Sequence, residues 1–278
     1  MTWLSAIIMG LVQGIAEFLP ISSSGHLAIA EHLLNMQGAS EIPQFYDVLL
    51  HLGTLVAVFI AYWDEIYDMI VEFFAGVGDL VHHTTPRVVL PARRMILLVI
   101  VGTLPLFLVL PINDKVEELY YITPFIGAAL LLTGCVLFVS DKMAPGTRTE
   151  RNMRFRDALT IGLCQCVATI PGLSRSGTTI TAGIATGLDR TFAMKYSFLL
   201  SLPAVLGANL LSFIKAIGEE SIEASLIPAY LLGMLAAMLS GIAAISLMKL
   251  IAKKSKFGWF AYYCWGAGVL TIILSLIF

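Results

Sequence analysis

The chain is poor in charge. Only 13% of its 278 residues are Asp, Glu, Lys or Arg, and 58% are hydrophobic. In an average soluble domain about 25% of the residues are charged and about 45–50% are apolar. This deficit excludes a disordered chain, a nucleic-acid-binding protein with a basic face and an ordinary cytosolic enzyme. No Lys or Arg precedes Arg87, so the basic n-region of a cleavable signal peptide is missing. One globular core cannot absorb so much apolar surface, and we expect the protein to be partly solvated by lipid.

Six apolar runs are long enough to cross a membrane, which takes about 20 mostly apolar residues. They cover residues 45–63, 95–111, 123–140, 191–214, 226–250 and 259–278. Two further apolar regions, 3–34 and 158–188, are each interrupted by a polar turn that contains proline and glycine. Irregular backbone is tolerated at membrane depth only where protein or a water-filled cavity surrounds it. We therefore expect two re-entrant helical hairpins.

The basic residues are distributed unevenly between these runs. Of 17 Lys and Arg residues, 14 lie in the stretches 64–94, 141–157, 188–195 and 249–258. The other connections, 112–121 and 213–225, hold one each and are otherwise acidic. The positive-inside rule places the basic stretches in the cytoplasm. This predicts a multi-pass membrane protein with both termini outside.

The two interrupted regions match each other in sequence. When the chain is shifted by 152 residues, seven of the 17 positions in 10–26 are identical to those in 162–178. Each hairpin is followed by three spans, and the two hairpins enter from opposite sides. The predicted fold is an all-α integral membrane protein with an inverted-topology repeat. The single membrane domain then consists of a first repeat (1–140), a cytoplasmic linker (141–157) and a second repeat (158–278).

The two hairpins differ where chemistry is expected. Glu17, Ser23 and His26 of the first hairpin correspond to Thr169, Arg175 and Thr178 of the second. Ionisable side chains inside a membrane are costly and usually functional. A structural interpretation remains for two of them: Glu17 could simply pair with Arg175, and His26 could be a packing histidine.

These side chains suit a phosphate ligand. Each turn opens a new half-helix, near Ser24 and Ser176, and a helix N-terminus attracts anions. The guanidinium of Arg175 can bind phosphate oxygens in a bidentate manner. Neutral donors come from the hydroxyl groups of Ser22, Ser24, Ser174, Ser176, Thr178 and Thr179. The predicted ligand is one phosphate or two in series, on a polyprenyl or glycerolipid head group. A supporting role for His51, which lies within a span, is left open.

Residues 13–26, Gln-Gly-Ile-Ala-Glu-Phe-Leu-Pro-Ile-Ser-Ser-Ser-Gly-His, resemble the first signature of the bacterial undecaprenyl-diphosphate phosphatases, the bacitracin-resistance family. Residues 171–179, Pro-Gly-Leu-Ser-Arg-Ser-Gly-Thr-Thr, are similar to the second signature. Length, span pattern and motif order agree, so the resemblance covers the whole chain. It implies hydrolysis of a C55 polyprenyl diphosphate to the monophosphate, the lipid carrier for cell-wall peptidoglycan synthesis. It also implies a location in the bacterial plasma (inner) membrane.

The resemblance also implies roles for individual residues. The functional positions of the family correspond here to Glu17, Ser23, His26, Ser174, Arg175, Ser176 and Thr179. The family is associated with a divalent cation, Mg²⁺ or Ca²⁺, and with a site open to the outer face. Glu17 is the expected metal ligand. Gln13 stands where many members have Glu, which leaves one carboxylate fewer, so we expect the substrate diphosphate to hold most of the metal.

Two hypotheses follow for the activity. In the first, Arg175 and the helix N-termini bind the diphosphate, and the nucleophile is Ser23, His26 or an activated water. Glu17 then acts as general base or orients His26. In the second, the protein is a carrier or flippase of polyprenyl phosphate or another anion, since inverted repeats are also typical of transporters. The oligomeric state is open, with a homodimer as one candidate.

Overall fold

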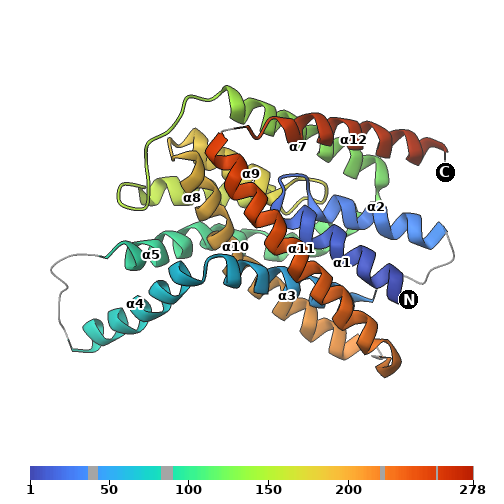
Figure 1. Cartoon of the computed structure of the whole chain (residues 1–278), viewed down its shortest axis with the longest axis horizontal. Helices are drawn as coiled ribbons and strands as arrows, with labels where there is room; N and C mark the ends of the chain where they lie inside the picture. Colours follow the sequence, from blue (N-terminus) through green and yellow to red (C-terminus); the bar gives the residue numbers. More distant parts are fainter. Residues whose placement is uncertain (37–42, 83–89, 220–222, 255, 278) are drawn as a thin grey trace.

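The computed structural model describes residues 1–36, 43–82, 90–219, 223–254 and 256–277, and its described part is helical without a β-strand (Figure 1). The α-helices are α1 (Trp3–Phe18), α2 (Ser23–Met36), α3 (Gln44–Ala61), α4 (Trp63–Val81), α5 (Pro91–Thr103), α6 (Asn113–Glu118), α7 (Thr123–Lys142), α8 (Phe155–Val167), α9 (Arg175–Ala185), α10 (Arg190–Glu219), α11 (Ile227–Lys254) and α12 (Trp259–Ile277). Short 3₁₀ helices are η1 (Leu104–Leu108), η2 (Leu110–Ile112), η3 (Leu119–Tyr121) and η4 (Ala224–Leu226).

The six expected spans are confirmed, with one change. Six helical stretches among the described residues are long and apolar enough to cross a membrane: Gln44–Ala61, Pro91–Tyr121, Thr123–Lys142, Arg190–Lys215, Ile227–Lys254 and Trp259–Ile277. The second of them is not one regular helix, because α5 gives way to η1 and η2. Pro105 and Pro111 lie in these 3₁₀ segments, and proline cannot donate the backbone hydrogen bond that continues an α-helix.

The four basic stretches meet at one end of the molecule. Asp141 pairs with Arg190 at 3.5 Å and accepts the Phe257 N–H at 3.0 Å, which joins three of them. The fourth is joined by the ion pair between Lys195 and Glu65, at 3.7 Å. Figure 1 shows both termini at the opposite end of the bundle.

The two acidic connections also lie together. Lys215, near the end of α10, is 4.0 Å from Asp114 and 3.7 Å from Glu117 of the other connection. The separation of charge between the two ends agrees with the topology expected from the sequence. Which end faces the cytoplasm stays a prediction.

Both interrupted regions are pairs of helices. α1 and α2 form the first, and α8 and α9 form the second, whose helical part runs from Phe155 to Ala185 rather than over 158–188. α1 packs on α11 so closely that a Cβ at Gly10 would overlap the carbonyl oxygen of Gly233. α8 packs on α5 in the same way, through Gly162 and the carbonyl oxygen of Gly102. This matched packing supports the inverted repeat, which stays a prediction.

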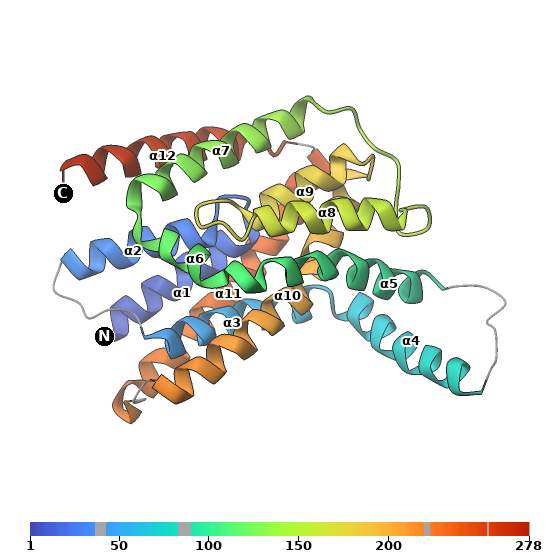
Figure 2. The same cartoon turned by 180° about the vertical axis from the view of Figure 1, so that it is seen from behind.

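The outer surface of the bundle is apolar. Large side chains such as Phe107, Leu132, Leu163 and Leu239 are about half exposed or more, as expected where lipid is the solvent. Figure 2 shows α7 and α12 side by side along one edge, and α4 projecting from the bundle in both views. The protein is thus an all-α, multi-pass membrane protein with two interrupted helix pairs.

Candidate active site

The first hairpin turns at Ser22. Its φ of 73° lies in the left-handed region, which is uncommon for a residue other than glycine and often marks a functional site. The Ser22 hydroxyl accepts the Gly25 N–H at 3.2 Å, and its carbonyl oxygen accepts the His26 N–H at 3.2 Å. These bonds cap α2 and make Ser23 its first residue.

The second hairpin has an equivalent cap. The Ser174 hydroxyl accepts the Gly177 N–H at 3.0 Å, so α9 begins at Arg175, the position that matches Ser23. Gly172 has a φ of 90° and packs against α7 without room for a Cβ. Thr133 of α7 donates to the Gly172 carbonyl at 3.2 Å and accepts the Ser174 N–H at 3.1 Å. α7 therefore holds this turn in place.

The two hairpins meet at the carboxylate of Glu17. The Arg175 guanidinium donates to its Oε1. The Ser23 hydroxyl donates to Oε2 at 2.6 Å, and the Gln13 side-chain amide donates to the same oxygen at 3.2 Å. The Glu17 side chain is 5% exposed and that of Arg175 is 25% exposed. The sequence motifs thus converge on one buried carboxylate.

The sequence left open that Glu17 simply pairs with Arg175, and this ion pair is present in the structure. It does not occupy the whole guanidinium, which has five N–H donors. Because Arg175 is a quarter exposed, it can hold Glu17 and still offer donors to a phosphate. The pair therefore serves both purposes: it keeps a buried charge neutralised and it aims the guanidinium at the junction of the hairpins.

The hydroxyl groups that were predicted to bind phosphate differ in how far they are already engaged in hydrogen bonds within the protein. Ser24 accepts the Gly172 N–H at 3.2 Å, and Ser176 is 3.4 Å from the Leu19 carbonyl, so both tie one hairpin to the other. Thr179 is 2% exposed and bonds the Ser197 hydroxyl at 2.6 Å. Thr178 is half-buried on α9. The direct contacts of Ser174 and Thr179 therefore stabilise the hairpin, and phosphate binding by any of these hydroxyls stays a prediction.

His26 is oriented by groups other than Glu17. Its Nδ1 is 2.8 Å from the Ser22 carbonyl oxygen, which can only accept, so Nδ1 carries the proton. Its Nε2 then accepts from the Tyr263 hydroxyl at 2.7 Å. The two rings stack with centroids 5.6 Å apart. The expectation that Glu17 orients His26 is replaced by a Ser22–His26–Tyr263 arrangement, while Glu17 holds Ser23.

Two more side chains reach the site from outside the motifs. Tyr120 of η3 lies close to Ser24 of α2. His51 of α3 lies close enough to Glu17 and Arg175 for electrostatic interaction with both. Tyr120 and Tyr263 had no sequence signal, because neither belongs to a motif and each is far along the chain from the hairpin that it contacts.

The site offers a divalent cation few protein ligands. In the described ranges, no three His, Cys, Asp or Glu side chains are grouped so that they could hold a metal ion. Oε1 of Gln13 is buried and lacks a hydrogen-bond partner among the described residues, and Gln13 also contacts Glu17. Mg²⁺ and Ca²⁺ prefer oxygen ligands, and Mg²⁺ usually keeps several waters. Gln13 and Glu17 therefore fit a cation whose other ligands come from phosphate or water.

Comparison with known proteins gives consistent matches over the whole chain. A family model described as bacitracin resistance protein BacA matches residues 6–270. A protein of Methanosphaera stadtmanae named undecaprenyl-diphosphatase is 42% identical over 281 residues, which cover 99% of this chain and 98% of the relative. A protein of the same name from Alkaliphilus metalliredigens is 39% identical, with 100% of both chains covered. Undecaprenyl-diphosphatase 3 of Bacillus cereus is 37% identical over 99% of this chain and 98% of the relative.

Proposed function

The chain belongs to the bacitracin resistance protein BacA family, and on that basis we propose that it hydrolyses undecaprenyl diphosphate to the monophosphate and inorganic phosphate. The names of its relatives are those of a phosphatase. They favour hydrolysis over the polyprenyl-phosphate or anion carrier that the sequence left as the alternative. The monophosphate product is the form of the lipid that serves as carrier in cell-wall synthesis.

The observation that carries this proposal is the junction of the hairpins at Glu17. A hydroxyl held at 2.6 Å by a buried carboxylate is a nucleophile beside a base. The guanidinium of Arg175 meets the same carboxylate from the other hairpin, so the cation that would bind the phosphate lies next to the nucleophile. The N-termini of α2 and α9, which are the positive ends of their helix dipoles, lie at the same junction and attract the same anion.

These contacts support Ser23 as the nucleophile. Its Oγ attacks the terminal phosphorus, the bond from that phosphorus to the bridging oxygen breaks, and the lipid monophosphate leaves. The proton of Ser23 passes to Glu17. Arg175 and the helix N-termini stabilise the charge that develops on the transferred group and on the leaving phosphate.

The second step is hydrolysis of the phosphoserine. Nε2 of His26 is the acceptor in its bond with Tyr263, so it carries a lone pair and takes a proton from the attacking water. The phosphorus–oxygen bond to Ser23 then breaks, and Glu17 returns its proton to the serine oxygen. His26 passes the proton that it took from water to the departing phosphate. Inorganic phosphate is released, and the site returns to its starting state.

A divalent cation, when bound, would neutralise part of the charge of the diphosphate. Gln13 and Glu17 would hold it together with substrate oxygens. The proximity of Tyr120 and η3 to Ser24 of α2 supports a site that faces the end carrying the acidic connections and both termini. With the positive-inside rule, that end is the outer face of the plasma membrane.

The test is release of inorganic phosphate from C55 polyprenyl diphosphate by the purified protein in detergent, where transport cannot be scored. Glu17→Gln keeps the shape and removes the base, so kcat should fall about 10²-fold or more, while substrate binding stays equal or tightens. Glu118→Gln, which removes a carboxylate from an exposed residue, is the matched control and should change neither. If Glu17→Gln and His26→Ala both keep near-normal release, this mechanism is wrong. If the unaltered protein releases no phosphate, the carrier hypothesis replaces the phosphatase.

A further inference from the structure

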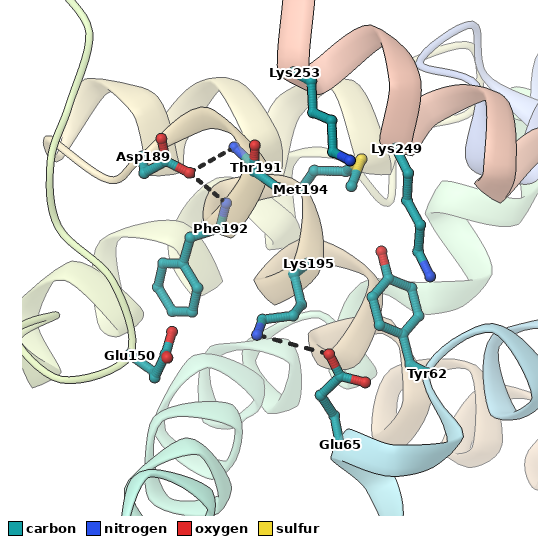
Figure 3. A pocket seen from close by; sticks show the side chains of 10 residues that line it. All are labelled: Tyr62, Glu65, Glu150, Asp189, Thr191, Phe192, Met194, Lys195, Lys249 and Lys253. Carbon is teal, nitrogen blue, oxygen red and sulfur yellow. Dashed lines mark hydrogen bonds and ion pairs between the residues drawn. The ribbon is translucent and has the colours of Figure 1, made fainter.

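A cavity lined by several charged side chains lies at the end of the molecule where the basic stretches meet. It has a volume of about 340 Å³, within the range of about 300–1,000 Å³ that is common for small-molecule pockets. Its walls come from the junction of α3 and α4, the start of α10 and the end of α11, with Glu150 from the connection before α8. Figure 3 shows its polar side chains pointing inward.

Tyr62 places an unused hydroxyl at the wall of this cavity. The residue is 3% exposed, and its hydroxyl has no hydrogen-bond partner in the part of the chain that the structure describes. Its ring is held by an edge contact with Phe198, centroids 6.2 Å apart, and by the Lys249 ammonium 4.1 Å from its centroid. Burial raises the pKa of Tyr62, so the hydroxyl stays protonated and can donate. A buried hydroxyl without a partner costs folding free energy, which a bound acceptor would recover.

The charges around the cavity are divided between its two sides. Lys195 pairs with Glu65 at 3.7 Å. Lys249 uses one donor on the Ala61 carbonyl at 2.7 Å and keeps two others. Lys253 is one helical turn further along α11 and has no ion pair within the described ranges. In Figure 3, Lys253 and the Tyr62 hydroxyl point toward the same part of the cavity.

Glu150 lies on the other side of the cavity, beside Phe192 (Figure 3). Asp189 is occupied, because one carboxylate oxygen accepts the N–H groups of Thr191 and Phe192 at 2.9 and 3.0 Å. The carboxylate of Glu65 interacts electrostatically with Tyr62 and is paired with Lys195. The corner formed by Tyr62, Lys249 and Lys253 thus has donors and positive charge, and its neighbouring carboxylate is already neutralised by another lysine. An ammonium pair with a neutral donor is a suitable set for an oxyanion.

We infer that this corner is a second phosphate site, in which the Tyr62 hydroxyl and the ammonium groups of Lys249 and Lys253 bind one phosphate group. It is distinct from the site at Glu17. Phe198 separates them, because its ring contacts Tyr62 on one side and Phe18, with centroids 5.5 Å apart, on the other. The ligand is inorganic phosphate or the head group of a lipid monophosphate, which can reach the cavity because Tyr62 directly follows the span that ends at Ala61. The inference is independent of the hydrolytic mechanism.

Calorimetry on the full-length protein in detergent tests this site. An Arg175→Lys background weakens the phosphate clamp of the first site and keeps a positive charge beside Glu17, and the probes are inorganic phosphate and farnesyl phosphate. Tyr62→Phe and Lys253→Gln should each weaken binding about tenfold. Lys254→Gln removes the same charge from an exposed neighbour that does not line the cavity and should change nothing. Much tighter binding of farnesyl phosphate identifies a lipid head group, whereas equal binding identifies free phosphate.

Thermal unfolding gives an independent measurement, because the Tyr62 hydroxyl should lower the melting temperature without phosphate and raise it when phosphate is bound. In phosphate-free buffer, Tyr62→Phe should melt at a higher temperature than the parent, since it removes an unpartnered buried hydroxyl. In the Arg175→Lys background, added phosphate should raise the melting temperature, and it should do so less when Tyr62→Phe is also present. The inference is overturned if neither probe binds, if Lys253→Gln and Lys254→Gln have equal effects, or if Tyr62→Phe is destabilised without phosphate. With Arg175 intact, Tyr62→Phe and Lys253→Gln should keep normal phosphate release, so this result and the failure of the phosphatase proposal can be told apart.

Discussion

Replacing Arg175 by lysine keeps the positive charge at the junction of the hairpins and removes the planar fork. The arginine can hold Glu17 with one N–H group and present the others to phosphate oxygens, whereas a single ammonium cannot reach both in fixed geometry. Loss of one donor aimed at a developing oxyanion costs about 2.7–4 kcal/mol. Since about 1.4 kcal/mol corresponds to a factor of ten, we expect kcat to fall about 10²- to 10³-fold in a phosphate-release assay at saturating substrate.

Lysine is the informative substitution because alanine would also damage the fold. The Glu17 side chain is 5% exposed, and leaving a buried charge unpaired typically destabilises a protein by about 3–5 kcal/mol. Arg156→Lys is the matched control, since the Arg156 side chain is 71% exposed and its nearest carboxylate oxygen is 4.0 Å away. If Arg175→Lys retains turnover close to that of Arg156→Lys, the guanidinium does not bind the transferred phosphate and the argument fails.

Further predictions concern orientation, topology and metal. Tyr263→Phe should lower kcat about five- to tenfold by removing the hydroxyl bonded to His26, while Tyr262→Phe should not; equal rates would leave Tyr263 with a packing role only. A cysteine at Glu118 should react with a membrane-impermeant thiol reagent from outside and one at Arg151 should not, and the reverse labelling would invert the topology. Excess chelator should abolish phosphate release, yet calorimetry of the substrate-free protein should show no tight Mg²⁺ binding; full activity in chelator would contradict any metal requirement.

Much of the architecture could be predicted because membrane spans are a matter of length and composition. All six spans were expected, and so were two interrupted regions, since Pro and Gly break a helix wherever they fall. The early end of α5 at Thr103 was not expected. Pro105 lies in a run that is otherwise largely apolar, so hydropathy alone does not reveal the change to 3₁₀ geometry.

The site was predictable in its residues but not in its pairings. Glu17, Ser23, His26 and Arg175 all lie in the motifs, and all four lie in the two hairpins that meet. The bonds between them depend on the left-handed turn at Ser22, which sets the direction of α2, and such a conformation has no signature in a serine. For that reason the sequence associated Glu17 with His26, whereas the structure joins it to Ser23.

The partners contributed by other helices were beyond the reach of local patterns. Tyr263 is 237 residues from His26 and lies in a helix whose apolar composition predicts only a span. Tyr120 lies in a short 3₁₀ segment of an acidic connection. Contacts of this kind arise from how the spans pack, and packing is decided by side-chain shape across the whole bundle rather than by the order of residues in one segment.

The account depends most directly on the claim that Ser23, activated by Glu17, receives the phosphoryl group. The decisive measurement is a rapid-quench experiment with C55 diphosphate that is labelled at the terminal phosphate, followed by mapping of the label on the chain. The account predicts transient label on Ser23, none in Ser23→Ala, and loss of phosphate release by that variant. Near-normal phosphate release by Ser23→Ala would contradict it.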